Sequence, residues 1–259
     1  MKNIKAIPFI LIQVVIFNYC SSGHKPDAKI KEVENHKIMV DGNTADWESI
    51  QPFVLESEDY LWIGEGLPEG RWKGRQDLSL SWKIAWHEQK IYFLFEVTDD
   101  ILSNFDQEFT WMNDCIEIHL DPENLGGNRI PGISEEDPLE LRLGKESYGY
   151  EMHILPMQLP RMYLDDTYQI FYKDSAQNEI FFHQWDGEIR TKYKDDGYVV
   201  EVGFNFPAAD GGEGKIFGLD IALCDDDGKG REKLMLWSTY KGAFWITMDD
   251  FIKMRLQSK

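Results

Sequence analysis

Alternation of apolar and polar residues with a period of two is the feature that most limits how this chain can fold. Between residues 78 and 97 two alternating runs follow one another, and the residues from His87 to Lys90 separate them. The apolar members are Leu78, Leu80, Trp82, Ile84 and Trp86, then Ile91, Phe93, Phe95 and Val97. Successive side chains of a strand point to opposite faces, so the pattern predicts a long β-hairpin.

Further short alternating segments follow along the chain, and no segment has sustained helical spacing. The predicted strands are 116–120, 139–143, 168–172, 180–185, 189–193, 198–206, 217–223, 234–237 and 252–256. Longer connections are expected at 57–74, 122–138 and 145–166. Many short strands with turn residues between them are typical of two packed sheets. We therefore predict an all-β domain over residues 37–259, a two-sheet antiparallel β-sandwich of the immunoglobulin-like or jelly-roll type.

The first residues form a separate unit. Lys2 and Lys5 precede an apolar run over residues 6–19 that is too short to span a bilayer, as in an export signal. Cys20 follows directly, and the arrangement resembles a bacterial lipoprotein signal. The resemblance implies a signal peptide over 1–20, a lipid anchor on Cys20, a polar tether over 21–36 and an exported protein at the outer membrane or cell surface. Ordinary cleavage near Cys20 is the alternative.

Charge and cysteine content restrict the partners of the chain. The 27 basic and 46 acidic residues give a formal charge of -19, which repels phosphate backbones and excludes nucleic acid as a partner. Beyond Cys20 the chain holds Cys115 and Cys224, and an exported compartment permits either a disulfide bond between them or two packed thiols. The six His have no paired metal-ligand spacing, which argues against zinc.

The segment from residue 111 to 121 carries the chemistry that most suggests a function. Alternation turns its apolar side chains toward a core and turns Glu117, His119 and Asp121 to the opposite face, near the indole of Trp111. A pyranose offers an apolar C–H face to an aromatic ring and a rim of hydroxyl groups to charged side chains. The segment therefore indicates a sugar-binding surface.

A series of ordered motifs strengthens this interpretation. They are Val40-Asp41-Gly42, Asp46-Trp47, Asp77-Leu78-Ser79, Val97-Thr98-Asp99-Asp100, Trp111, Asn113-Asp114, Ile116-Glu117-Ile118, Gly197 to Val202, Gly218-Leu219-Asp220, Asp225-Asp226-Asp227, Trp237 and Phe251 to Leu256. In order and spacing they resemble the family 9 carbohydrate-binding modules, whose fold is shared with the DOMON-like group. The resemblance implies a DOMON-like β-sandwich that binds a poly- or oligosaccharide and is not an enzyme.

The resemblance also assigns the site residues. In that family a sugar lies between two Trp rings and is oriented by charged side chains. It implies a stacking role for Trp111, recognition of hydroxyl groups by Glu117 and Arg142, and a second ring at Trp245. The structural alternatives are a hydrophobic lid at Trp111, a cross-strand ion pair between Glu117 and Arg142, and core packing of Trp245. Phe244 or Tyr240 is the alternative second ring. Gly242 stands three residues before Trp245, where the family usually carries an Asn.

Two acidic clusters are candidates for a metal site. Asp225 and Asp227 lie in one of them, and Asp99 with Asp100 forms the other. Calcium prefers hard oxygen ligands of this kind, and members of the family often hold structural calcium. The resemblance therefore implies calcium at Asp225 and Asp227, with a solvated acidic turn as the alternative.

Other functions remain open at this point. A haem-binding DOMON-like electron-transfer domain would use axial His and Met ligands, for which His119, His153 and Met152 are available. The chain could also be a scaffold beside a glycoside hydrolase, or itself a hydrolase.

A hydrolase would need two carboxylates across a cleft, such as Glu117 with Asp220 or Glu201. We expect instead a binding protein whose partners are a carbohydrate, the membrane through the lipid on Cys20, and a glycan-degrading enzyme or a transporter.

Overall fold

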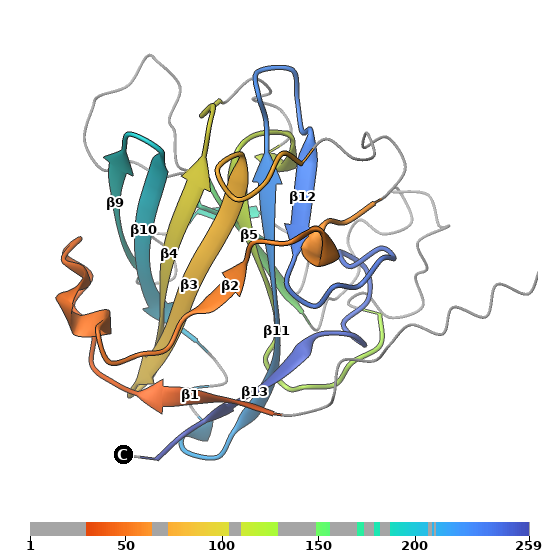
Figure 1. The fold of residues 1–259 in the computed structure, drawn as a ribbon. Coiled ribbons are helices and arrows are strands. Elements are labelled where there is room, and N and C mark those ends of the chain that lie inside the picture. The colour runs from red at the N-terminus through yellow and green to blue at the C-terminus, as the bar shows by residue number, and fades with distance from the viewer. Residues whose placement is uncertain are drawn as a thin grey trace, which may run out of the picture.

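The computed structural model describes residues 30–63, 72–103, 110–128, 149–155, 170–173, 179–181, 187–206, 209 and 211–258. Within these ranges the regular elements are β-strands and short 3-10 helices, which confirms the all-β prediction. The strands form two layers that face each other (Figure 1). Among the described residues no helix has the length and apolar character needed to cross a bilayer.

One layer, sheet 1, contains the predicted hairpin. Its strands are β2 (Phe53–Leu55), β3 (Leu78–His87), β4 (Lys90–Asp99), β9 (Glu188–Lys194) and β10 (Gly197–Asn205). They pair antiparallel in the order β2-β3-β4-β10-β9. The hairpin between β3 and β4 is confirmed, and Glu88 in its two-residue turn has a positive φ of 55°.

The other layer, sheet 2, is also antiparallel. Its strands are β5 (Cys115–Asp121), β6 (Tyr150–Ile154), β7 (Ile170–Lys173), β8 (Glu179–Phe181), β11 (Ile216–Asp225), β12 (Lys233–Leu236) and β13 (Ile252–Leu256). The order is β8-β7-β6-β5-β11-β13, and β12 pairs with β11. The 3-10 helices η1 (Thr44–Trp47), η2 (Glu58–Tyr60) and η3 (Thr110–Met112) lie in the connections.

The strand β1 (Lys31–Asn35) joins the two sheets. Residues 31–33 pair parallel with β13, and residues 34–35 pair parallel with β3. Val33 is fully buried in the core. The sheet therefore begins inside the segment 21–36 that was expected to be a tether, and the domain boundary moves from residue 37 to Lys31.

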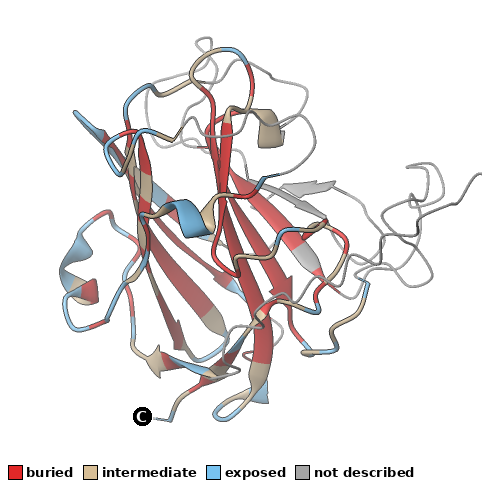
Figure 2. Cartoon of the chain, turned by 45° about the vertical axis from the view of Figure 1, so that its right-hand side comes forward, coloured by how far each residue is buried: buried red, intermediate tan, exposed pale blue. Residues whose placement is uncertain are grey.

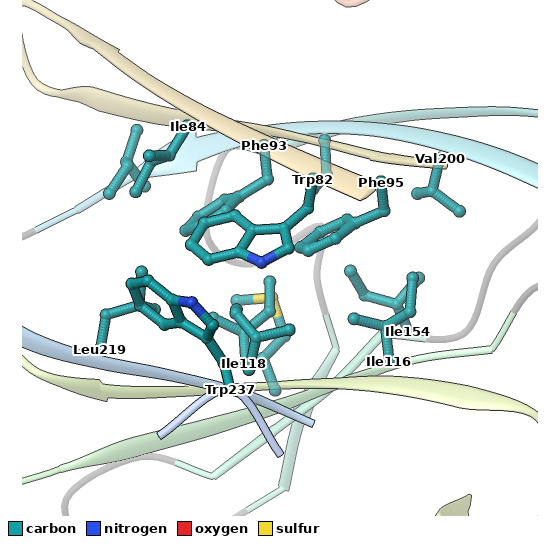
Figure 3. Close-up of a cluster of buried hydrophobic side chains, with 14 of the residues drawn as sticks. Trp82, Ile84, Phe93, Phe95, Ile116, Ile118, Ile154, Val200, Leu219 and Trp237 are labelled. Atoms are coloured by element: carbon teal, nitrogen blue, oxygen red, sulfur yellow. The ribbon is translucent and has the colours of Figure 1, made fainter. Parts of the chain in front are cut away.

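The core fills the space between the sheets. Trp82 from β3 and Trp237, which follows β12, meet edge to face with ring centroids 4.7 Å apart. Figure 3 shows the facing side chains, with Phe93 and Phe95 on one side and Ile116 and Ile118 on the other. Buried residues run along the central strands of both sheets (Figure 2). Burial of this apolar surface is the main stabilising contribution to the sandwich.

The prediction of a connection over residues 145–166 was wrong in its first part. β6 occupies residues 150–154 and pairs with β5 and β7. Its sequence alternates, since Met152 and Ile154 enter the core while Glu151 and His153 lie on the other face. The run is only five residues long, which made its period easy to miss. The strand predicted at 139–143 lies outside the described residues.

Candidate functional site

The outer face of β5 carries the polar residues that the alternation predicts. Ile116, Ile118 and Leu120 enter the core, whereas Glu117 and His119 lie on the opposite face. This face is nonetheless covered, since Glu117 is 2% exposed and His119 is fully buried. A small apolar cluster on the same side of sheet 2, described below, provides part of the cover.

Both carboxylate oxygens of Glu117 accept hydrogen bonds. Nε2 of His119 lies 3.0 Å from Oε2, and the thiol of Cys224 on β11 donates to Oε1 over 3.2 Å. Burial by itself would raise the pKa of Glu117, but the hydrogen bond from His119 and the charges of His153 and His119 lower it to about 2. Glu117 is therefore ionised throughout the physiological range and acts only as an acceptor.

β6 adds a second pair of charged groups beside the first. In the register of the two strands, His153 lies opposite Glu117 and Glu151 lies opposite His119. Nε2 of His153 and Oε1 of Glu151 are 2.8 Å apart. The four side chains form a block of alternating acid and imidazole on one face of sheet 2. Glu151 was assigned to no site from the sequence, and His153 was considered only as a haem ligand, although the short alternation of β6 could have placed both beside Glu117.

Trp111 lies next to this block. It belongs to η3, immediately before β5, and is half-buried. Its indole meets the imidazole of His153 edge to face, with centroids 6.2 Å apart and an interplanar angle of 86°. The structure therefore brings Trp111 and Glu117 into the same region, since His153 contacts one and lies opposite the other.

Trp245 reaches the block through an aromatic neighbour. Its half-buried ring packs edge to face against Phe244 at 5.2 Å and against Trp62 at 5.6 Å. Phe244 in turn meets the ring of His119 at 5.1 Å. The apolar cluster that covers this part of sheet 2 comprises Trp62, Cys115, Leu155, Ala222, Cys224, Leu234, Leu236 and Phe244, with Tyr240 and Trp245 packed against it. Trp245 thus has packing contacts as well as a position beside the site.

Gly242 gives room to Tyr240. A Cβ atom at position 242 would lie 2.3 Å from the phenol oxygen of Tyr240, which is closer than such atoms approach. Gly242 has no positive φ, so space and not backbone conformation requires a glycine. Its carbonyl accepts a hydrogen bond of 2.9 Å from Nε1 of Trp62. The side chain of Tyr240 occupies the volume that an Asn at position 242 would need.

Arg142 and Cys20 lie outside the described residues. Among the site residues predicted from the sequence, Trp111, Glu117 and Trp245 share the outer face of sheet 2. The hydrolase pair Glu117 and Glu201 does not share a face. Glu201 lies on the outer face of sheet 1, where it accepts hydrogen bonds from the indole of Trp47 and the backbone of Gly42.

The haem alternative meets a similar obstacle. Met152 is buried in the core between the sheets, whereas His119 lies on the outer face of sheet 2. A Met–His pair of axial ligands must reach one iron from two sides, so Met152 cannot serve together with His119 or with His153, which also lies on the outer face. Asp220, the other carboxylate considered for hydrolysis, accepts hydrogen bonds from the backbone and the hydroxyl of Ser238.

Carboxylates gather at the ends of β4, β5 and β11. Oxygens of Asp99, Asp114 and Asp225 lie within 4.8 Å of one another, and so do oxygens of Asp99, Asp100 and Asp227. Burial and mutual repulsion raise the pKa values of Asp99 and Asp114. The predicted residues Asp225 and Asp227 therefore belong to two groups that share Asp99.

Lys233 offsets part of this negative charge. Its ammonium group lies 2.5 Å from Oδ2 of Asp225 and 3.3 Å from Oδ2 of Asp77. Burial raises the pKa of Asp225 to about 6 despite this contact. Oδ1 of Asp225 and Oδ1 of Asp227 are buried without a hydrogen-bond partner in the described part of the chain, whereas Oδ1 of Asp77 lies 3.3 Å from Nζ of Lys73. Unpartnered buried oxygens and repelling carboxylates suit a divalent cation with oxygen ligands.

Comparison with solved structures shows which fold this is. A carbohydrate-binding module of family 9 from Caldicellulosiruptor kristjanssonii in complex with glucose superimposes with a TM-score of 0.58 at 16% sequence identity, covering 89% of this chain and 97% of the other. A module from the same family and organism in complex with cellotriose gives a TM-score of 0.56 at 15% identity, covering 89% and 95%. The two-sheet sandwich is therefore the fold of these modules.

No curated protein sequence matches this chain significantly. The sequence does match the family described as carbohydrate family 9 binding domain-like, over residues 63–129 and 161–259. These two stretches contain β3 to β5 and β7 to β13, together with Trp111, Glu117, Trp245 and the acidic cluster. On this match, which takes in most of the sandwich, the chain belongs to the carbohydrate family 9 binding domain-like family.

Proposed function

We propose that this protein is a non-catalytic carbohydrate-binding module that recognises a poly- or oligosaccharide at the outer face of sheet 2. Its family and the sugars bound by the two similar structures support the class of ligand. The observation that carries the proposal is the position of Glu117. This ionised carboxylate is linked to the half-buried Trp111 through His153, and to the half-buried Trp245 through His119 and Phe244.

In the proposed complex the two indoles stack on the apolar faces of sugar rings, and Glu117 accepts hydrogen bonds from hydroxyl groups. A thiol is a weak donor, so a sugar hydroxyl can replace Cys224 as the partner of Oε1. Stacking and charge-assisted hydrogen bonds each contribute roughly 1 to 3 kcal/mol, which predicts micromolar or weaker affinity for a single sugar ring. From the family pattern, Arg142 supplies a guanidinium group to the same ligand.

Isothermal titration calorimetry with glucose and cellotriose tests the proposal. We expect the parent protein to bind at least one of them, and Trp111→Ala to lose most of the binding while it still unfolds cooperatively. Tyr193→Ala removes a 56% exposed ring from β9 in sheet 1 and is a matched control that should bind normally. Unchanged binding by Trp111→Ala would refute the site. Consumption of cellotriose over time would show that the protein is an enzyme.

We also propose a structural calcium ion at the acidic cluster. Asp99, Asp114, Asp225 and Asp227 would hold it through their carboxylate oxygens. The ion would supply positive charge that neutralises the buried carboxylates and fixes the ends of β4, β5 and β11. A rise in melting temperature on adding calcium to chelator-treated protein would support this role. Equal melting temperatures with calcium and with chelator would contradict it.

The signal-like segment over residues 1–20 suggests where the protein is located in the cell. We propose that the chain is exported, lipidated at Cys20 and held at the outer membrane or cell surface of a bacterium, where it keeps glycan near a degrading enzyme or a transporter. Expression in a bacterium that lipidates exported proteins should place the parent in the detergent-soluble membrane fraction. Cys20→Ser should release it from that fraction, and a membrane-bound variant would contradict the anchor.

A further inference from the structure

Cys115 and Cys224 face each other directly across β5 and β11. They are Cα partners in the antiparallel register, and both are fully buried. Directly opposed residues of antiparallel strands have Cα atoms about 4.5 to 5.5 Å apart. That interval lies within the range of roughly 4.4 to 6.8 Å that disulfide bonds span. The backbone therefore already has the separation that a disulfide bond requires.

The side chains also point the same way. Opposed residues of a ladder share one face of the sheet, and both thiols belong to the apolar cluster on the outer side of sheet 2. The two sulfur atoms and one oxygen of Glu117 all lie within 4.8 Å of one another. Nη1 of Arg231 lies 3.8 Å from the sulfur of Cys224. A guanidinium group at this place opposes a metal cation between the thiols, which leaves bond formation between the sulfurs as the favoured chemistry.

We propose that Cys115 and Cys224 form a cross-strand disulfide bond and that its formation releases Oε1 of Glu117 for a ligand hydroxyl. The oxidant is a disulfide compound such as oxidised glutathione. One cysteine thiolate attacks a sulfur of the oxidant and expels one thiolate. The second cysteine thiolate then attacks the mixed disulfide and expels the other. The two protein thiols lose two electrons and two protons, and the oxidant is reduced to two thiols.

The timing of this reaction follows from the burial of the pair. Burial raises the pKa values of both thiols, so thiolate is scarce in the folded protein and exchange there is slow. The bond therefore closes while the chain folds, before the apolar cluster covers the sulfurs. Once closed, it joins residues far apart in sequence and restricts the unfolded chain.

The second half of the proposal rests on the proposed carbohydrate-binding function. In the reduced protein the thiol of Cys224 donates to Oε1 of Glu117. A disulfide has no S–H group, so the bond removes this donor and draws the sulfur of Cys224 toward Cys115. Glu117 then keeps His119 as a partner of Oε2 and has Oε1 open to a sugar hydroxyl.

Thiol counting tests the bond itself, without any sugar. The full chain with Cys20→Ser is refolded in a buffer of oxidised and reduced glutathione, denatured, and treated with a maleimide. We expect no modified cysteine, a parent mass lower by two hydrogen atoms, and a digest peptide pair that joins residues 115 and 224. Two modified cysteines after refolding would overturn the proposal.

The melting temperature tests for the same disulfide bond independently. The oxidised protein should melt roughly 5 to 15 °C above protein that was unfolded and refolded in dithiothreitol. Cys115→Ser and Cys224→Ser, each in the Cys20→Ser background, should show no such difference and should keep one reactive thiol. If a variant fails to fold, the mass of the parent protein still decides the question.

Calorimetry with cellotriose tests the release of Glu117. We expect the oxidised protein to bind roughly threefold to tenfold more tightly than the reduced protein, because one competing hydrogen bond is removed. A disulfide that forms without any change in affinity would overturn the release of Glu117. Absence of binding in both forms would contradict the carbohydrate-binding function, and the thiol count would still show whether the disulfide bond forms.

Discussion

Nε2 of His119 donates a hydrogen bond of 3.0 Å to Oε2 of Glu117, two residues earlier on β5. Because Glu117 is ionised, the imidazole must be the donor. The carboxyl has a pKa of about 2 in the folded protein, compared with an ordinary value of 4.5. A lowered pKa stabilises the folded state above the unfolded value, and this contribution disappears as the pH falls from about 4.5 to 2.

Glu117→Gln should therefore change both the stability of the protein and its dependence on pH. Near neutral pH we expect a loss of about 1 to 3 kcal/mol in the free energy of unfolding, because an amide cannot accept from both His119 and Cys224. Between pH 4.5 and 2 the variant should lose less stability than the parent. Urea unfolding across this range measures both effects. Glu96→Gln, at a half-buried glutamate of sheet 1, is the control. If the free energies of unfolding of the parent and of Glu117→Gln change in parallel with pH, the lowered pKa of Glu117 is contradicted.

Trp245→Ala should affect binding and stability together. Its ring packs against Phe244 and Trp62, so its loss removes aromatic contacts as well as a stacking surface. We expect affinity for cellotriose to fall at least tenfold and the melting temperature to fall by roughly 4 to 8 °C. Calorimetry and thermal unfolding check the two effects. A lower melting temperature with unchanged affinity would show that Trp245 serves only packing.

The acidic cluster predicts a pH dependence of the opposite sign. Burial raises the pKa of Asp225 from 3.8 to about 6 and also raises those of Asp99 and Asp114. A raised pKa favours the protonated folded state, so this stability is present below about pH 4 and is lost as the pH rises through the folded values. Without calcium, the free energy of unfolding should fall as the pH rises from about 4 toward 8, and calcium should reduce that fall.

Asp99→Asn isolates this effect, since Asp99 belongs to both acidic groups. Thermal unfolding with chelator at about pH 7.5 should show a higher melting temperature than the parent, because the amide removes the cost of protonating this carboxyl group when the chain folds. Added calcium should stabilise the variant less than the parent. Asp195→Asn, in the exposed turn between β9 and β10, is the control and should respond to calcium normally. An equal calcium response in Asp99→Asn would contradict the metal site.

Gly242→Asn should not improve binding, although it restores the residue usual in the family. The new side chain would meet the phenol of Tyr240, whose oxygen lies 2.3 Å from the position of the added Cβ. We expect a destabilisation of about 1 to 3 kcal/mol in urea unfolding. Tyr240→Ser in the same chain should recover part of it. Equal stability of parent and Gly242→Asn would refute the steric argument.

Much of the fold could be predicted because period-two alternation reports directly on which face of a strand is buried. The long alternating runs of β3 and β4 predicted the hairpin that these strands form. The strand predicted at 252–256 has the same bounds as β13. β1 and β2 were missed because they are short and half exposed, with little alternation to detect. The parallel pairing of β1 depends on contacts with strands far away in sequence, which a local pattern does not contain.

The site was harder to predict than the fold. Alternation placed Glu117 and His119 on one face, and the family pattern drew attention to Trp111 and Trp245. Neither could show that β6 brings His153 opposite Glu117, since strand register depends on the partner. The spacing of the His residues along the chain gave no hint of this neighbourhood for the same reason. The burial of Glu117 also went unforeseen, because the apolar cluster on the same face of sheet 2 draws members such as Trp62 and Phe244 from distant segments.

The pairing of β1 with both sheets determines how this domain would respond to a mechanical pulling force. Lys31 is the first residue of β1, the strand that pairs with both β13 and β3. A force on that end acts along the strand axis, so the bonds to both neighbours would be loaded in shear together and could not be unzipped one after another. The sandwich should therefore resist unfolding when a force pulls on its amino-terminal end.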